Sequence, residues 1–293
     1  MTRRTTNQPD RASHNLASKQ VRAKAQSAGT PTRGPVPRRG AMNRRPRVAA
    51  SGARASRPLR ALVCAPAMPE FDRESGSKRV YDFILFFREA GWEVTFASRH
   101  TIGRPGRYVR LLEKAGGVVR PAQGDDISEL VRYGGFDLAL LAFWHIGELY
   151  TPLLRALSPR TKIVVDSVDL HFVRNARFTF VQPADGATPR LIEPSTGAEI
   201  VRELNAYAAA DAVLAVSDDE ARLVNSLLGD QANASVVPDG EDLRLSRRSF
   251  GARKGMMFVG NFRHAPNVDA IAYLCRDILP RLPKSVLKAH PLS

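Results

Sequence analysis

Polar residues that could bind a ligand or move a proton follow three apolar runs of the chain. Ser75 and Gly76 stand just before a predicted helix, His145 follows a second run, and Asp169 and His171 follow a third. Each apolar run is typical of a buried strand. In an open parallel sheet, ligands bind outside the carboxyl ends of the strands. We therefore expect these residues to lie where such a sheet places its ligands.

Each of these segments has both a chemical and a structural interpretation. The backbone N–H groups at the start of a helix, with Gly76 allowing close approach, form an anion or sugar site, although Ser-Gly is also an ordinary helix cap. His145 is either a base or hydrogen-bond donor, or a buried structural histidine. The segment 166–171 holds two carboxylates and a histidine, but no matching cluster stands nearby in the sequence, so we expect no metal.

A fourth segment, near the C-terminus, joins a predicted strand to a predicted helix. Gly260 would let a phosphate approach the backbone, and Arg263 would pair with it, whereas a plain strand-to-helix turn is the alternative. The chain has no GxGxxG after its first strand, no Walker lysine loop and no GxSxG elbow. These absences count against a nicotinamide dehydrogenase, a P-loop nucleotidase and an α/β-hydrolase.

The elements that must position these residues alternate between strands and helices. The run 60–65 predicts a buried strand, and Val80, Phe83, Ile84 and Phe87 have the spacing of a helix face. Further strands are predicted at 93–98, 117–120, 138–143, 162–166, 212–216 and 235–237, with helices between most of them, and 175–193 is predicted to be irregular. This alternation predicts an α/β fold with a Rossmann-like parallel sheet.

Composition divides the chain into four parts. Residues 1–57 are basic, with repeated Pro and Gly and no apolar periodicity, which predicts a disordered tail. Residues 58–240 form the Rossmann-like domain, and the polar, basic stretch 241–255 is a predicted linker. Residues 256–293 predict one strand, 256–260, and one helix opened by Pro266, the start of a second, incomplete Rossmann-like domain.

The net charge of +15 comes almost entirely from the tail, because residues 1–60 hold 15 of the 44 Lys and Arg residues and one acid. The functional interpretation is a basic arm for nucleic acid or an anionic surface, but the tail lacks the aromatics that stack on bases, so nucleic acid is not the expected partner. A solvated extension, a start codon placed too far upstream and an organellar transit peptide are alternatives. Two cysteines and no long apolar run suit a cytoplasmic protein.

Taken in order, several segments resemble bacterial glycosyltransferases of the GT-B fold, in the group-1, family-4-like branch. The resemblance covers roughly 59–282. The segments that carry it are Arg73-Glu74-Ser75-Gly76-Ser77, Asp166-Ser167-Val168-Asp169-Leu170-His171-Phe172, Ala210-Asp211-Ala212-Val213-Leu214-Ala215-Val216-Ser217, Val237-Pro238-Asp239-Gly240 and Phe258-Val259-Gly260-Asn261-Phe262-Arg263-His264-Ala265-Pro266-Asn267-Val268-Asp269.

The resemblance implies an enzyme that transfers a sugar from a nucleotide-sugar donor to a glycan or lipid-linked acceptor. It places His145 among the catalytic residues. It assigns Ser75, Gly76, Asp169 and His171 to the acceptor side, and Gly260 and Arg263 to the donor side. The resemblance implies no metal and no cofactor, since helix N-termini and basic side chains stabilise the departing diphosphate. Peripheral association with the inner face of a membrane is a further expectation.

The sequence also departs from the family pattern near its C-terminus. The later part of the family's donor domain, with an acidic residue for the ribose and a basic pair for the diphosphate, has no counterpart in the 39 residues from Gly255 to Ser293. We therefore expect a truncated glycosyltransferase, inactive alone unless a partner supplies the rest. The alternative from another class is a non-catalytic protein that binds nucleic acid or an anionic surface through its tail.

Overall fold

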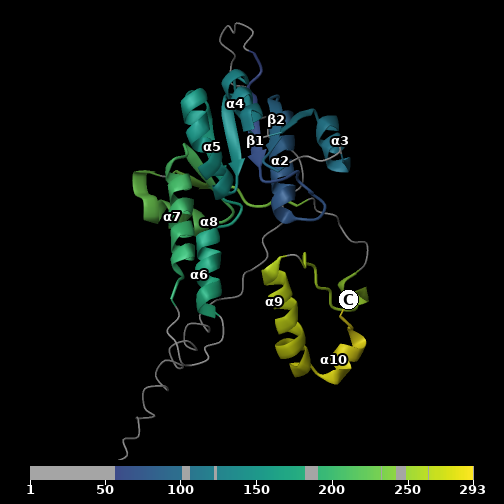
Figure 1. Cartoon of the computed structure of the whole chain (residues 1–293). Helices are drawn as coiled ribbons and strands as arrows, with labels where there is room; N and C mark the ends of the chain where they lie inside the picture. Colours follow the sequence, from purple (N-terminus) through teal and green to yellow (C-terminus); the bar gives the residue numbers. More distant parts are fainter. Residues whose placement is uncertain are drawn as a thin grey trace, which may run out of the picture. The chain divides into compact units, whose positions relative to one another are not determined.

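The computed structural model of the chain describes residues 57–100, 106–121, 124–181, 191–231, 233–241, 249–262 and 264–292 (Figure 1). The chain divides into two units, Met1–Arg54 and Ala55–Ser293. Every described residue belongs to the second unit. The predicted basic tail, residues 1–57, therefore lies outside the described residues except for Arg57.

A sheet of seven strands forms the centre of the second unit, and all its neighbouring strands run parallel. The order across the sheet is β3-β2-β1-β4-β5-β6-β7. The strands are β1 (Arg60–Ala65), β2 (Glu93–Ser98), β3 (Gly117–Pro121), β4 (Leu138–Ala142), β5 (Lys162–Asp166), β6 (Ala212–Ala215) and β7 (Ala234–Val236). The predicted Rossmann-like α/β fold is confirmed.

Helices connect successive strands, as a parallel sheet requires. They are α2 (Ser75–Glu89), α3 (Arg107–Lys114), α4 (Gly124–Tyr133), α5 (Trp144–Leu157), α6 (His171–Val181), α7 (Pro194–Ala208) and α8 (Asp218–Leu228). In the described part of the chain, no helix has the length and apolar character needed to cross a membrane.

Two apolar layers hold the helices against the sheet, because alternate strand residues point to opposite faces. In β1, Ala61 and Val63 pack with residues of α2 and α3, whereas Leu62 and Cys64 belong to the layer that includes α4, α5, α7 and α8. All four side chains are fully buried. The uninterrupted apolar run of β1 is therefore explained by burial on both faces.

The prediction that residues 175–193 are irregular is partly wrong, because α6 covers residues 171–181. Residues 182–190 lie outside the described part. The buried Glu203 carboxylate of α7 caps this helix, accepting hydrogen bonds from the backbone N–H groups of His171 at 2.9 Å and Phe172 at 2.7 Å. Such a cap comes from a distant residue and cannot be recognised from the local sequence.

The C-terminal part differs from the prediction as well. The expected strand Met256–Gly260 makes one isolated bridge, from Met256 to Leu292, and does not join the sheet. The expected helix does form, as α9 (Ala265–Tyr273), and continues into the π-helical turn η3 (Leu274–Ile278). Among the described residues 249–262 and 264–292, none is fully buried, so this segment contributes no core of its own.

Candidate functional site

The order of the strands reverses between β1 and β4, and the polar residues gather at this switch point. Ligands of open α/β sheets bind in the crevice outside the carboxyl ends of the strands at such a point. A cleft of about 1150 Å³ opens there. Its described lining comes from the loop after β1, the first turn of α2, the residues after β4 and β5, Arg174, Asp239 and residues of the segment 259–267.

Gly76 lies where the first turn of α2 meets two residues of unusual backbone conformation. Phe143, just after β4, has φ 74°, and Val168, just after β5, has φ 62°. A Cβ atom on Gly76 would lie 3.3 Å from Cγ1 of Val168 and 3.4 Å from Cζ of Phe143. Left-handed backbone costs about 1–3 kcal/mol at a residue other than glycine and concentrates at functional sites. A Cβ atom at position 76 would therefore press on Val168 and touch Phe143.

His145 is the second residue of α5 and lies behind the cleft wall. Its ring stacks on that of Phe143, with 5.6 Å between ring centroids, and Phe143 lines the cleft whereas His145 does not. Burial, together with the nearby His171, lowers the pKa of His145 to about 4. The imidazole is therefore neutral at pH 7, and it has no side-chain hydrogen bond to any described residue. A pKa of about 4 makes this imidazole a weaker base than an ordinary histidine.

His171 is held on both ring nitrogens. The indole Nε1–H of Trp144 donates to Nδ1 at 3.0 Å, and Nε2 lies 3.1 Å from Oδ1 of Asp169. These partners require the tautomer with its proton on Nε2, because Nδ1 accepts a hydrogen bond. His171 therefore holds Asp169 and Trp144 in place.

Asp169 lines the cleft, but both of its carboxylate oxygens already have partners. Oδ1 contacts His171, and Oδ2 forms an ion pair with Arg174 of α6. Burial acts to raise the pKa of Asp169, but the hydrogen bond from His171 and the charge of Arg174 outweigh it and lower the pKa. The carboxylate is ionised at neutral pH. It pairs with the guanidinium of Arg174, which comes from α6 and also lines the cleft.

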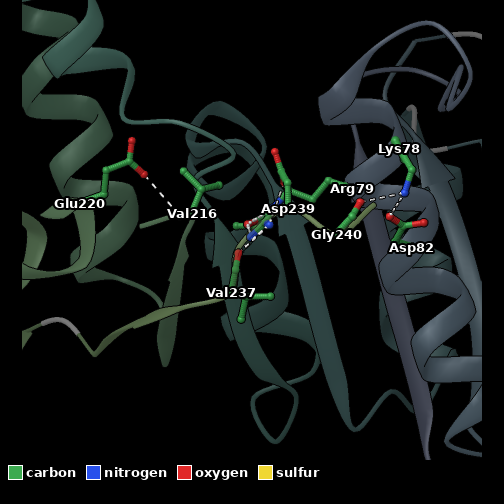
Figure 2. A network of polar contacts seen from close by, with 9 residues as sticks. Lys78, Arg79, Asp82, Val216, Glu220, Val237, Asp239 and Gly240 are labelled. Carbon is green, nitrogen blue, oxygen red and sulfur yellow. Dashed lines mark hydrogen bonds and ion pairs between the residues drawn. The ribbon is translucent and has the colours of Figure 1, made fainter. Parts of the chain in front are cut away.

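Arg79, on α2, joins three segments beneath the cleft. Its Nε and Nη2 atoms bond the carboxylate of Asp166 at the end of β5, with a shortest distance of 2.8 Å. Its Nη1 donates to the carbonyl of Val237 at 2.7 Å and to Oδ1 of Asp239 at 3.1 Å. Figure 2 shows this guanidinium between α2 and the segment that follows β7.

Burial shapes the protonation of this network. The side chains of Arg79 and Asp166 are 3% and 0% exposed. Burial raises the pKa of Asp166, and the Arg79 guanidinium opposes that shift. A buried charge is tolerated only where it is paired and hydrogen-bonded, and Arg79 is bonded to two carboxylates and a carbonyl.

Lys78, the neighbour of Arg79, holds the next residue of the same segment. Its Nζ atom donates to the carbonyl of Gly240 at 3.0 Å and to Oδ2 of Asp82 at 2.7 Å (Figure 2). Consecutive residues of α2 therefore fix the chain from Val237 to Gly240. The helix α2, whose first turn lines the cleft, therefore also holds the segment that follows β7.

The described lining of the cleft combines apolar side chains with ionisable groups that are largely paired. Its ionisable groups include four carboxylates and two guanidinium groups: Glu70, Glu74, Asp169, Asp239, Arg73 and Arg174. Glu70 pairs with Arg73 at 3.0 Å, and Asn261 donates a hydrogen bond of 2.9 Å to Glu74. This set of hydrogen-bond acceptors, with aromatic rings beside them, suits a ligand rich in hydroxyl groups better than a bare anion.

The structure places three of the four residues predicted for the acceptor side at the cleft. Ser75, Gly76 and Asp169 line the cleft, whereas His171 stands behind it. On the predicted donor side, Gly260 lines the cleft, and a Cβ atom there would lie 3.0 Å from the side chain of Asn267. Arg263 lies outside the described residues.

The described residues contain no cluster of three or more His, Cys, Asp or Glu side chains arranged to hold a metal. The side chains that the sequence did not single out are Arg79, Asp239 and Glu203. Asp239 stands beside Pro238 and Gly240 in a typical turn sequence, and Arg79 and Glu203 occupy helix positions where charged residues are ordinary. Only their burial, at 5% exposure for Arg79 and 1% for Glu203, sets them apart.

Comparison with known proteins gives likenesses of fold. No protein family matches the sequence, and no curated protein sequence matches it either. Among solved structures, the sucrose-phosphate synthase of Thermosynechococcus elongatus matches 62% of this chain at 15% identity, with a TM-score of 0.41. The chain spans about half of that protein, 48% of its length.

Two dehydrogenase-type structures are similar to a comparable extent. The glucose dehydrogenase of Haloferax mediterranei matches at 14% identity and a TM-score of 0.31, covering 62% of this chain and 38% of that one. The L-sorbose reductase of Gluconobacter frateurii matches at 14% identity and a TM-score of 0.34, covering 59% and 76%. With TM-scores below 0.5, these likenesses assign neither a family nor a chemistry to this chain.

Proposed function

We propose that the protein is a glycosyltransferase that moves a sugar from a nucleotide-sugar donor to a hydroxyl of a glycan or lipid-linked acceptor. The observation that carries the proposal is the composition of the switch-point cleft. Three of its four carboxylates pair with cationic side chains, Glu70 with Arg73, Asp169 with Arg174 and Asp239 with Arg79, and its lining includes the first turn of α2. The resemblance in the sequence supports the same assignment.

The connection between β1 and α2 favours this function over hydride transfer. Nine residues, 66–74, separate the strand from the helix, and they include Pro66 and Pro69 but no glycine. A dinucleotide-binding fold uses a tight turn with three glycines here, so that the backbone can approach a pyrophosphate. This longer loop instead contributes carboxylate and guanidinium groups to the cleft.

In the proposed reaction, the acceptor oxygen forms a bond to the anomeric carbon while the bond from that carbon to the diphosphate breaks. The acceptor's hydroxyl proton passes to a base, and the nucleoside diphosphate leaves with the bonding electron pair. The sequence resemblance, and not the geometry, carries the assignment of His145 as the candidate base, since its ring lies behind Phe143 in the cleft wall. The N–H groups at the start of α2 would favour the negative charge that develops in the cleft.

The test is release of nucleoside diphosphate by the full chain. UDP-glucose, UDP-N-acetylglucosamine and GDP-mannose are each incubated with a labelled oligosaccharide and with a polyprenyl phosphate. Acceptor-dependent release supports the proposal, and its loss in His145→Ala but not in His100→Ala, an exposed histidine outside the cleft lining, supports the role of His145. Binding of NADH or NADPH without binding of any nucleotide sugar would overturn it.

A further inference from the structure

Asp239 differs from Asp169 in how its carboxylate oxygens are used, and from Glu70 and Glu74 in that the side chain holding it, Arg79, is buried. Asp169 has a partner on each oxygen, His171 on one and Arg174 on the other. Asp239 accepts one hydrogen bond on Oδ1, from Nη1 of Arg79. Within the described part of the chain, its Oδ2 atom has no hydrogen-bond partner. One oxygen is thus fixed from behind and the other is left to accept.

Arg79, the residue that holds Asp239, is itself fixed in place. The Arg79 side chain is 3% exposed, and its nitrogen atoms also donate to Asp166 and to the carbonyl of Val237. The side chain of Asp239 is 53% exposed and lines the cleft. A polar group oriented by a buried, fully bonded neighbour loses little freedom when a ligand arrives, and this is the property of a preorganised binding residue.

We propose that Asp239 is a ligand-binding residue of the cleft, which accepts a hydrogen bond from a sugar hydroxyl, and that Arg79 is the residue that positions it. This inference rests on the proposed function and deepens it, since it names the part of the ligand that is recognised. Asp239 selects for a hydroxyl, because an ionised carboxylate only accepts hydrogen bonds and a deoxy position offers none.

Binding of nucleotide sugars by the full chain tests the assignment. The probes are UDP-glucose, UDP-N-acetylglucosamine and GDP-mannose, followed by the monodeoxy analogues of whichever probe binds. Asp239→Asn should weaken binding of the parent sugar about tenfold, since a hydrogen bond to a charged group is lost. For one deoxy analogue the same substitution should change the affinity little, because the partner hydroxyl is already missing.

Asp219→Asn is the matched control, because Asp219 forms an exposed ion pair with Arg222 and does not line the cleft. It should bind the parent sugar as the wild type does. An Asp239→Asn protein with wild-type affinity for the parent sugar, or with the same loss for every deoxy analogue, would overturn the assignment of Asp239 and leave the proposed function standing. If the wild type binds none of the three probes, both proposals fail.

A comparison of Asp239→Asn in two backgrounds tests whether Arg79 positions Asp239. Arg79→Lys keeps the positive charge but loses the planar fork that reaches two carboxylates and a carbonyl at once. In that background Asp239→Asn should cost clearly less affinity than in the wild type, because the carboxylate is no longer held in place. Equal costs in the two backgrounds would show that Arg79 only stabilises the fold. A melting curve for each variant establishes that the compared proteins are folded.

Discussion

Arg79 and Asp166 form a buried ion pair in which Nε and Nη2 of the guanidinium both bond the carboxylate, at distances from 2.8 to 3.0 Å. The pair joins the second turn of α2 to the last residue of β5, which lies 87 residues further along the chain. Residues that follow each of them in the sequence, Val80 after Arg79 and Val168 after Asp166, line the cleft, so the pair links the core of the sheet to the site.

Removing one member of this pair should be strongly destabilising. Arg79→Met leaves the Asp166 carboxylate buried without its partner, and the loss of a single partner from a buried pair costs about 3–5 kcal/mol. Urea unfolding curves give the free energy of unfolding. Arg222→Met, which breaks the exposed pair with Asp219, should leave the midpoint nearly unchanged. Equal losses in the two variants would contradict the structural role of the buried pair.

Gly76 and Gly197 offer a matched comparison, since both lie early in helices of 15 residues. Alanine is favoured over glycine within a helix by up to about 1 kcal/mol. Gly197→Ala meets nothing within 4 Å and should raise the free energy of unfolding by about that amount. Gly76→Ala gains the same preference but presses on Val168 and touches Phe143, so its net gain should be smaller or negative.

The larger substitution Gly76→Val should narrow the cleft as well as strain its wall. Nucleotide-sugar binding should therefore fall in Gly76→Val and stay at the wild-type value in Gly197→Ala. Thermal melting and a binding titration on the same preparations separate the two effects. If Gly76→Ala stabilises the protein as much as Gly197→Ala does, the close approach to Val168 and Phe143 is not restrictive.

The low pKa of His145 predicts a pH dependence of stability. The unfolded chain takes up a proton on this imidazole near pH 6.5, whereas the folded protein does so only near 4. Between these values the unfolded state binds more protons, so the free energy of unfolding falls as the pH is lowered through this window. His145→Gln should make the difference between pH 7 and pH 5 smaller, and His100→Gln should not. An NMR titration that gives His145 a pKa near 6.5 would contradict the burial of its ring.

The sequence predicted the sheet well because burial on both faces leaves a direct mark on composition. The runs that became β1, β4 and β5 are continuous and apolar, and each is observed close to its predicted bounds. The predicted strand Met256–Gly260 has a similar composition but makes only one bridge. A strand is stabilised by neighbours that supply hydrogen bonds and cover its faces, and local sequence carries no information on whether they are present.

The candidate site was predictable to the extent that it follows from topology. Strand ends of a parallel sheet converge, so Gly76 and Asp169 could be expected at one cleft, and both line it. The pairing of Arg79 with Asp166 and Asp239 joins positions 87 and 160 residues apart. Nothing in the local pattern distinguishes Arg79 from a solvated helix arginine, because its role depends on the burial that the finished fold provides.

Glu203 should control the start of α6, and through it the position of Arg174. Its carboxylate, 1% exposed, accepts the N–H groups of His171 and Phe172 and the hydroxyl of Tyr207 at 2.8 Å. Glu203→Gln leaves one oxygen for these donors and puts an amide N–H₂ group against one of them. An unsatisfied buried donor costs about 1–3 kcal/mol.

Hydrogen exchange shows which part of the protein is destabilised by Glu203→Gln. The amides of His171 and Phe172 should exchange at least tenfold faster in Glu203→Gln, since tenfold corresponds to about 1.4 kcal/mol of local opening free energy. Glu199→Gln is the matched control, because Glu199 lies one turn earlier on α7 and is exposed. In Glu199→Gln, the amides at the start of α6 should exchange as in the wild type. Uniform acceleration across the sheet in Glu203→Gln would instead indicate global destabilisation, and α6 would then not depend on this cap.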